Sequence, residues 1–216
     1  MGAAAGHDDV VGEDLGPWEP FSVETVAAVM HATDAVWWLS GGQALDRFLG
    51  RVTREHGDID VSIPRHDLAR VATRLGDRLE LQIASGGRLY DLDAGPAPEL
   101  VHGLWARERV RGPWRVQINL EPVEGDDWVF RRDPRVRRPL EQVVHDRDSL
   151  PRVNPAVQLL WKAKDPLPKD EIDLVNVLPL LPPDERVWLR DTIALAHPDS
   201  AWRGRFDAPR GRSRRA

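Results

Sequence analysis

The sequence predicts an α+β fold, a mixed β-sheet with flanking helices followed by a C-terminal helical subdomain. Three observations support this prediction. A short apolar strand, a double glycine, a helix and a second strand follow one another over residues 37–63. Polar and apolar residues alternate over residues 114–122, which is typical of a strand. Apolar residues then recur with helical spacing between residues 154 and 196.

The N-terminal elements are predicted from capping and periodicity. Ser22 can cap a helix whose apolar stripe lies on residues 23–30. This helix leads to a first strand over residues 35–39. We expect Trp37 and Trp38 to pack on opposite faces of that strand, since core packing of such a pair is commoner than stacking on a ligand.

Further helices and strands follow in alternation. A helix over residues 43–49 precedes a strand that begins at Asp58 and reaches Ile63. Pro64 is expected to open a helix that ends near Leu75. Residues 78–84 and 88–92 are predicted to form two strands around a Ser-Gly-Gly turn.

The middle and C-terminal parts are less uniform. Residues 105–111 fit either an edge strand or a connection, and one or two arginine-rich strands are expected from Asp126 onward. The arginines of that segment either face a triphosphate or anionic substrate or form a salt-bridged edge; they are Arg131, Arg132, Arg135, Arg137 and Arg138. Three helices are predicted over residues 154–164, 169–178 and 184–196. Their inward residues are expected to include Val157, Leu160, Trp161, Ile172, Leu174, Val175, Leu178, Val187, Trp188, Ile193 and Leu195.

Length and composition are those of a soluble globular protein. The 216 residues carry 30 Lys and Arg against 35 Asp and Glu, a formal net charge of −5. Because there is no cysteine, disulfides, thiolate metal sites and a thiol nucleophile are excluded. The seven histidines lack the spacing of zinc ligands. There is neither an apolar run of membrane-spanning length nor a signal-peptide pattern, so we expect a cytoplasmic protein with no membrane partner.

The charges are distributed unevenly along the chain. Six arginines lie in residues 203–216, which leaves the rest of the chain strongly acidic. An acidic body repels nucleic acid and attracts cations, so nucleic acid is a disfavoured partner.

Two acidic residues suggest a metal site. Asp58 and Asp60 lie two apart, so the alternation of a strand directs both carboxylates to one face. Carboxylates without His or Cys nearby favour Mg²⁺ or Mn²⁺. Because Mg²⁺ usually completes its coordination with water and phosphates, this pair predicts a nucleoside triphosphate (NTP) as the second ligand source.

The double glycine fits the same interpretation. Gly41 and Gly42 allow close approach of a triphosphate to the backbone, and the following helix offers N–H groups to phosphate oxygens. Arg51 and Arg54 add positive charge on the same connection. Taken singly, these residues fit an ordinary turn and an ordinary strand start; their combination in this order favours a nucleotide site.

The stretch GGQALDRFLGRVTREHGDIDVSI resembles the aminoglycoside 2''-adenylyltransferase-like nucleotidyltransferases, within the DNA polymerase beta-like superfamily, and more loosely the lincosamide nucleotidyltransferases. The resemblance implies a magnesium-dependent transfer of a nucleoside monophosphate from an NTP, with ATP the expected donor, to a hydroxyl of a small aminoglycoside-like molecule. We expect a nucleotidyltransferase domain over residues 18–150 and, from the change to helical periodicity, a helical subdomain over residues 151–202. Residues 1–17 are expected to be a disordered terminus and residues 203–216 a basic disordered tail.

The third carboxylate of this family is replaced here. In the family pattern an Asp, followed two residues later by Glu-Pro, serves as metal ligand and general base; in this sequence that position is Asn119. An amide coordinates Mg²⁺ weakly and cannot take a proton from a hydroxyl. Glu121 is the first candidate substitute, and Asp91 and Asp93 are weaker ones. Without a substitute, the protein would bind nucleotide and transfer slowly or not at all.

The three lysines fall between two predicted helices. They are Lys162, Lys164 and Lys169, and the KDEID stretch that begins at Lys169 resembles a signature of related bacterial nucleotidyltransferases. Lys162 or Lys169 can hold a triphosphate, because an ammonium group is a compact charge. The alternative is an ion pair between Lys169 and Asp173.

Two classes of function remain open. The first is an enzyme whose partners are an NTP and a small hydroxyl-bearing acceptor, with the acidic body favouring a cationic one. An acceptor on RNA or protein, as in nucleotidyltransferase toxins, also fits. The second is a catalytically impaired nucleotide- or partner-binding module of the same fold.

Overall fold

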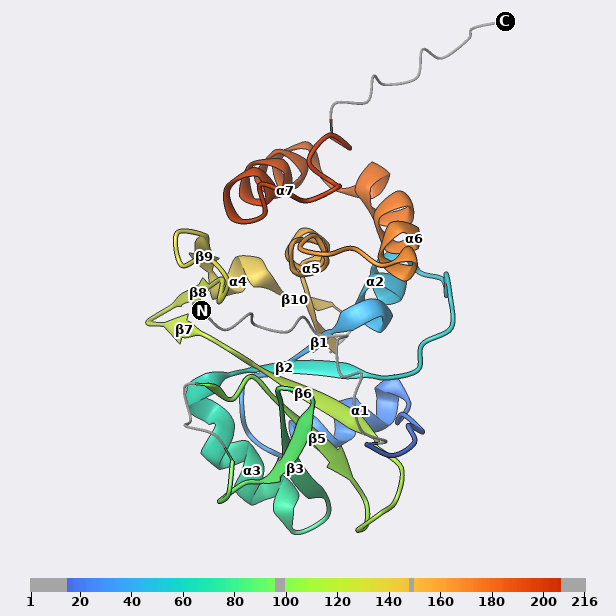
Figure 1. The fold of residues 1–216 in the computed structure, drawn as a ribbon, viewed down its shortest axis with the longest axis vertical. Helices are drawn as coiled ribbons and strands as arrows, with labels where there is room; N and C mark the ends of the chain where they lie inside the picture. The colour runs from blue at the N-terminus through green and yellow to red at the C-terminus, as the bar shows by residue number, and fades with distance from the viewer. Residues whose placement is uncertain (1–14, 96–99, 148–149, 207–216) are drawn as a thin grey trace, which may run out of the picture.

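The computed structural model describes residues 15–95, 100–147 and 150–206, and its core is an eight-stranded mixed sheet (Figure 1). The strands of this sheet are β1 (Trp38–Ser40), β2 (Asp60–Pro64), β3 (Glu80–Ser85), β4 (Arg88–Asp91), β5 (Gly103–Arg107), β6 (Val116–Glu121), β10 (Val144–Arg147) and β11 (Leu150–Val153). Their order is β10-β11-β1-β2-β6-β5-β3-β4. The β1–β11 and β2–β6 pairs are parallel, and the others are antiparallel.

A smaller sheet stands beside the large one. It has the order β7-β8-β9 and consists of β7 (Val123–Glu124), β8 (Asp127–Val129) and β9 (Arg137–Pro139). These are the arginine-rich strands expected after Asp126, and they pair with one another instead of extending the main sheet.

Helices cover both faces of the large sheet (Figure 1). The α-helices are α1 (Val23–His31), α2 (Gly41–Leu49), α3 (Leu68–Gly76), α4 (Leu140–Val143), α5 (Pro155–Lys162), α6 (Pro168–Val177) and α7 (Pro183–Ala196), with 3₁₀ turns η1 (Arg65–Asp67) and η3 (Leu178–Leu180). Figure 1 shows α1 and α3 on one side and α2, α5, α6 and α7 on the other. No helix in the described ranges has both the length and the apolar character needed to cross a membrane.

Several local predictions are confirmed. Ser22 caps α1, with its Oγ accepting a hydrogen bond from the N–H of Thr25 at 3.1 Å. Trp37 and Trp38 are both buried in the core. The predicted strand over residues 114–122 is β6, and the expected hairpin is the antiparallel β3–β4 pair.

Other element boundaries differ from the predictions. The first strand is β1, three residues later than its predicted start, and α2 begins at Gly41, whose φ of +71° favours glycine. The second strand begins at Asp60 and not at Asp58, because the carbonyl of Asp58 accepts a hydrogen bond from the Gln43 side chain. Pro64 does not open a helix; its extended backbone ends β2, and α3 starts at Leu68.

The tertiary structure also decides between the two predictions for residues 105–111, an edge strand or a connection. This segment contributes to β5, an interior strand between β6 and β3 and not an edge strand. Its burial pattern is consistent with that place, since Leu104 and Ala106 on one face are fully buried and Trp105 on the other face is partly buried.

The inward faces of the C-terminal helices are only partly as expected. Leu174 and Ile193 are buried, but Ile172, Val175, Val187 and Leu195 are exposed, so those four predictions are wrong. In α6 the helix directs the carboxylates of Asp170 and Asp173 inward. The residues on the opposite side of the same helix, which include Ile172 and Val175, therefore face outward.

The chain passes directly from the large sheet into the C-terminal helices. Strand β11 spans the predicted boundary at residues 150 and 151 and leads through Asn154 directly into α5. Most of the two predicted terminal segments, residues 1–17 and 203–216, lies outside the described residues.

The start of α5 predicts a measurable stability effect. Asn154 is fully buried, its Oδ1 accepts from the N–H of Ala156, and its Nδ2 donates to the Gln142 carbonyl and to Glu185. Replacing it by alanine removes a cap and leaves buried partners unsatisfied, so we expect Asn154→Ala to lower the free energy of unfolding by about 2–3 kcal/mol in urea titrations.

The matched control is the exposed cap of α1. Ser22→Ala removes the same kind of helix cap at the surface and should cost about 1 kcal/mol or less. An Asn154→Ala loss no larger than the Ser22→Ala loss would contradict the role assigned to Asn154.

Candidate active site

The turn between β1 and α2 packs tightly against the side chains around it. A Cβ atom on Gly41 would lie 2.3 Å from Oδ2 of Asp60, and one on Gly42 would lie 2.3 Å from Nη2 of Arg54. The N–H of Gly41 donates to Oε1 of the buried Gln158 at 2.8 Å. Because neither glycine leaves room for a side chain, the backbone of the turn lies directly against a carboxylate and a guanidinium group.

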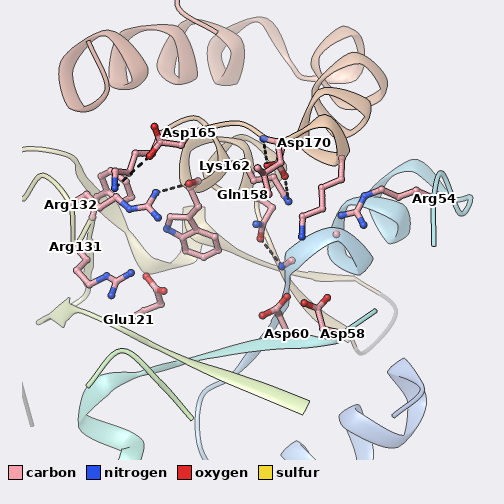
Figure 2. A pocket seen from close by; sticks show the side chains of 17 residues that line it. Arg54, Asp58, Asp60, Glu121, Arg131, Arg132, Gln158, Lys162, Asp165 and Asp170 are labelled. Carbon is pink, nitrogen blue, oxygen red and sulfur yellow. Dashed lines mark hydrogen bonds and ion pairs between the residues drawn. The ribbon is translucent and has the colours of Figure 1, made fainter. Parts of the chain in front are cut away.

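Asp58 and Asp60 point side by side into a cleft above this turn (Figure 2). Asp60 is buried at the start of β2, with 9% of its surface exposed, and Asp58 precedes it. Gln43, in the first turn of α2, donates from Nε2 to the carbonyl oxygen of Asp58 at 2.9 Å. The helix that follows the glycines therefore also fixes the backbone that carries the carboxylates.

A chain of hydrogen bonds ends on Asp60. Trp105 Nε1 donates to Gln117 Oε1 at 3.0 Å, Gln117 Nε2 donates to Asn119 Oδ1 at 2.9 Å, and Asn119 Nδ2 donates to Asp60 Oδ1 at 3.2 Å. The amide oxygen of Asn119 is thus already an acceptor for Gln117. Where the resemblance leads us to expect a third carboxylate, this protein presents a hydrogen-bond donor to Asp60.

The cleft lies between the large sheet and the C-terminal helices and encloses about 1080 Å³ of open space, part of it solvent. Its charged and polar walls come from α2, β2, β6, the segment after β8, α5 and α6. The residues that line it are Gly41, Gly42, Arg54, Asp58, Asp60, Glu121, Phe130, Arg131, Arg132, Gln158, Trp161, Lys162, Lys164, Asp165, Leu167, Lys169 and Asp170.

Two cations and two carboxylates form a closed network at the α6 wall. Asp173 binds Arg54 through both carboxylate oxygens, at 3.1 and 3.2 Å, and also lies 3.2 Å from Lys162. Lys162 pairs with Asp170 at 2.5 Å. Burial acts to lower the pKa of Arg54 and of Lys162, but the neighbouring carboxylates outweigh it and raise both pKa values, so both side chains stay charged.

The other predicted cofactor residues are placed differently. Lys169 lines the cleft. Arg51 does not: its side chain is exposed, and its Nη2 donates to Oδ1 of Asn176 in α6 at 2.6 Å. The prediction that Arg51 contributes to the phosphate site is therefore wrong.

Glu121 lies at the opposite end of the cleft from Asp58 and Asp60 (Figure 2). In the parallel β2–β6 register, Asp60 is level with Gln117 whereas Glu121 is level with Pro64, about 13 Å further along the strands. In the described part of the chain, no three acidic or histidine side chains gather as a metal-binding group. The prediction that Glu121 substitutes for the third metal ligand is therefore wrong.

Glu121 has other partners. Its Oε2 accepts a hydrogen bond from Trp128 Nε1 at 2.9 Å, and burial raises the pKa of its carboxyl group although Trp128 and nearby arginines act to lower it. The weaker substitutes, Asp91 and Asp93, are exposed at and beyond the end of the edge strand β4 and do not line the cleft.

Comparison with known proteins gives a match over part of the chain. Residues 22–81 match the family model described as aminoglycoside-2''-adenylyltransferase. A 2''-aminoglycoside nucleotidyltransferase from Escherichia coli is 42% identical over 67 residues, and one from Klebsiella pneumoniae shows the same identity. The matched stretch covers 30% of this chain and 38% of each relative, well under half of either protein.

Solved structures extend the likeness to most of the fold. The structure of ANT(2'')-Ia in complex with adenylyl-2''-tobramycin has a TM-score of 0.52 at 15% identity and covers 80% of this chain and 97% of its own. The lincomycin-bound lincosamide antibiotic adenylyltransferase LnuA has a TM-score of 0.51 at 16% identity and covers 72% and 93%. The fold of this chain is therefore similar to that of these two adenylyltransferases.

The matched sequence covers only one side of the cleft. Residues 22–81 include the double glycine, Arg54 and the Asp58–Asp60 pair. The opposite wall, which carries Glu121, Arg131 and Lys162, lies beyond the match. The similarity in sequence therefore concerns the glycine and carboxylate half of the site.

Some residues of the candidate site have no signal in the sequence. Gln158 binds the N–H of Gly41 across 117 positions, and Asp173 binds Arg54 across 119. Neither is adjacent to a recognisable motif except that Asp173 ends the KDEID stretch. Trp161, by contrast, is half-buried and lines the cleft, whereas its helical spacing indicated an inward core position.

Near Glu121, a neutral histidine predicts pH-dependent stability. Arg65 Nη2 lies 3.1 Å from Nδ1 of His102; since a guanidinium can only donate, Nδ1 is the acceptor and is unprotonated. Burial, together with the charges of Arg131 and Arg65, lowers the pKa of His102 to about 4. The unfolded chain, with a pKa near 6.5, binds the proton first as the pH falls, so this part of the stability is present above about pH 6.5 and is lost towards pH 4.

Urea titrations at pH 7 and pH 5 test this expectation. The free energy of unfolding should fall on acidification, and His102→Gln, which keeps an acceptor for Arg65, should reduce the fall by about 1–2 kcal/mol after solvent screening. His66→Gln, at an exposed side chain, is the control and should leave the fall unchanged. Equal pH dependence of wild type and His102→Gln would refute the assignment.

Proposed function

We propose that this protein is a magnesium-dependent nucleotidyltransferase that moves a nucleoside monophosphate from an NTP, with ATP the expected donor, to a hydroxyl group of a small molecule. The observation that supports this most directly is the contact between Gly41 and the carboxylate of Asp60, with Asp58 beside it in one cleft. Direct contact between a proposed metal-binding pair and a proposed phosphate-binding turn is expected when one ligand, an NTP with its metal ion, binds to both.

The donor set at Asp58 and Asp60 fits Mg²⁺ or Mn²⁺. Both residues offer hard oxygen ligands on a rigid segment, and two carboxylates leave the remaining coordination positions to water and phosphate oxygens. When bound, the ion would neutralise charge on the phosphates and on the departing pyrophosphate.

The phosphates are proposed to bind at the start of α2. The first N–H groups of a helix have no acceptor within the helix, and the helix dipole favours an anion there. Arg54, held against Gly42 by Asp173, adds a fixed positive charge beside this turn. Lys162 and Lys169 contribute from the facing wall of the cleft.

In the proposed reaction, the acceptor hydroxyl oxygen forms a bond to the α-phosphorus of the NTP. The bond from that phosphorus to the oxygen bridging to the β-phosphate breaks, and pyrophosphate leaves with the electron pair. The hydroxyl proton passes to solvent, because Asn119 cannot accept it and Glu121 is at the other end of the cleft. The protein then contributes positioning and electrostatics without a general base, so transfer should be slow.

A second candidate is a nucleotide-binding module without transfer activity. It is favoured by one observation, the amide of Asn119 in place of the third carboxylate. An aminoglycoside-like acceptor is an analogy from the names of the relatives, because the matched residues 22–81 do not include the wall formed by residues 121–132.

The proposal predicts that transfer depends on the carboxylate pair. Purified protein with Mg²⁺ and labelled ATP, GTP, CTP or UTP would be offered pooled small molecules, aminoglycosides, total RNA and protein. Asp58→Asn and Asp60→Asn should each reduce label transfer by at least about 100-fold, since each removes a charged metal ligand. Asp34→Asn is the matched control. It makes the same carboxylate-to-amide change at an exposed ion pair with Arg74 and should leave label transfer unchanged.

The outcomes separate the candidates. Label on small molecules supports the proposed function, and label on RNA or protein supports the toxin type of nucleotidyltransferase. Nucleotide binding with no label on any acceptor supports the module.

The missing carboxylate predicts a gain of function. Asn119→Asp places a second carboxylate beside Asp60, where Asn119 now donates at 3.2 Å. The new group can accept the hydroxyl proton, so transfer should rise by about 100-fold or more. In EDTA the two like charges should repel each other and lower the melting temperature, and Mg²⁺ should restore it. No rate gain together with no Mg²⁺-dependent stabilisation would contradict the role proposed for this position.

A further inference from the structure

Two guanidinium groups line the cleft beside one carboxylate, at the end of the cleft away from Asp58 and Asp60. Arg131 and Arg132 follow β8, Arg65 follows β2, and all three interact electrostatically with Glu121. In Figure 2, Arg131 and Arg132 lie with Glu121 on the opposite side of the cleft from Asp58 and Arg54. The two ends of the cleft are therefore built from different residues.

The arginines are not fully neutralised by this carboxylate. Arg132 donates to the carbonyl oxygen of Trp161 at 2.6 Å, and Arg65 donates to the neutral His102 at 3.1 Å. Within the described residues, Arg131 makes neither a hydrogen bond nor an ion pair, although its guanidinium lies beside Glu121 at the same end of the cleft. Among the residues that line this end of the cleft, two positive charges against one negative charge leave a local excess of one.

Burial makes this excess unfavourable without a ligand. Desolvation is the main cause that lowers the pKa of Arg131 and of Arg132, and mutual repulsion among the arginines lowers both further. The neighbouring pair Lys164–Asp165 is neutral in sum, with its charged atoms 3.6 Å apart. An anion that entered here would replace lost hydration with charge-assisted hydrogen bonds.

The opposite end has no such excess. Arg54 and Lys162 are balanced by Asp170 and Asp173. The triphosphate proposed to bind there is held by the metal ion and the start of α2. The arginine cluster, defined as Arg131 and Arg132, is therefore available for a second ligand.

We infer that the arginine cluster binds an anionic group, a phosphate or a carboxylate, on the acceptor molecule. The inference rests on the proposed nucleotidyl transfer and narrows its acceptor class. Guanidinium forks match phosphate and carboxylate oxygens in geometry as well as charge. A polycationic acceptor would bring ammonium groups against two arginines, so the acceptor differs in charge from the aminoglycosides in the names of the relatives.

A phosphate titration tests the anion site directly. ¹⁵N-labelled protein would be saturated with Mg²⁺ and the non-hydrolysable ATP analogue AMPCPP, and then titrated with inorganic phosphate. The side-chain Nε–H signal of Arg131, assigned by its loss in Arg131→Gln, should shift at millimolar phosphate. The signal of Arg137, which pairs with Glu124 outside the cleft, should not.

Two results of the titration would overturn the inference. One is an Arg131 signal that phosphate does not move. The other is an Arg131 signal already moved to its end point by the nucleotide analogue alone, which would assign the cluster to the triphosphate.

The transfer assay then identifies the acceptor class. A small-molecule extract would be separated by ion exchange into anionic, neutral and cationic fractions, with tobramycin added to the cationic one. Label should enter the anionic fraction, and Arg131→Gln should raise the KM for that acceptor by about 10- to 100-fold with the KM for ATP unchanged. Arg137→Gln, the same charge change on β9, should alter neither value.

Label that enters only the cationic fraction would overturn the inference. If no fraction is labelled, the proposed transfer fails, and the phosphate titration alone still decides whether the arginine cluster binds an anion.

Discussion

The site depends on a contact that only glycine permits. Helix α2 begins at Gly41 with a positive φ, and its missing side chain lets the carboxylate of Asp60 lie where a Cβ atom would otherwise be. The same helix returns a hydrogen bond from Gln43 to the backbone of Asp58. Turn, helix and carboxylates thus form one rigid unit, in which any displacement of the turn would displace the proposed metal ligands.

The second wall of the cleft is tied to this unit by charge. Asp173 in α6 binds Arg54 from the loop before β2 and Lys162 from α5, so three segments meet at one buried carboxylate. Buried carboxylates and cations of this kind are costly to separate, because each would leave an uncompensated charge. The network fixes the spacing between the sheet and the helical layer, which sets the width of the cleft.

The two ends of the cleft differ in the net charge of the side chains that line them. Near Asp58 the charges of the side chains are balanced or negative. This suits a triphosphate that binds together with a divalent cation, because the cation neutralises part of the phosphate charge. Near Glu121 the arginine cluster leaves positive charge in excess, which suits an anion that arrives without a metal ion. Asn119 belongs to the carboxylate end, because its amide donates a hydrogen bond to Asp60.

The sequence by itself determined the local parts of this protein. Periodicity and capping predicted α1, α5 and β6, and the order of a double glycine and two aspartates predicted one half of the site, because those residues interact over short distances along the chain. Only the tertiary structure decided that Glu121 is remote from Asp60, since the register of the β2–β6 pair sets that distance. It also decided that Arg51 points away, that Asp173 and Gln158 join the site, and that Arg131 lies in the cleft. Those outcomes depend on contacts between distant segments, and no local pattern encodes which side chains such contacts bring together.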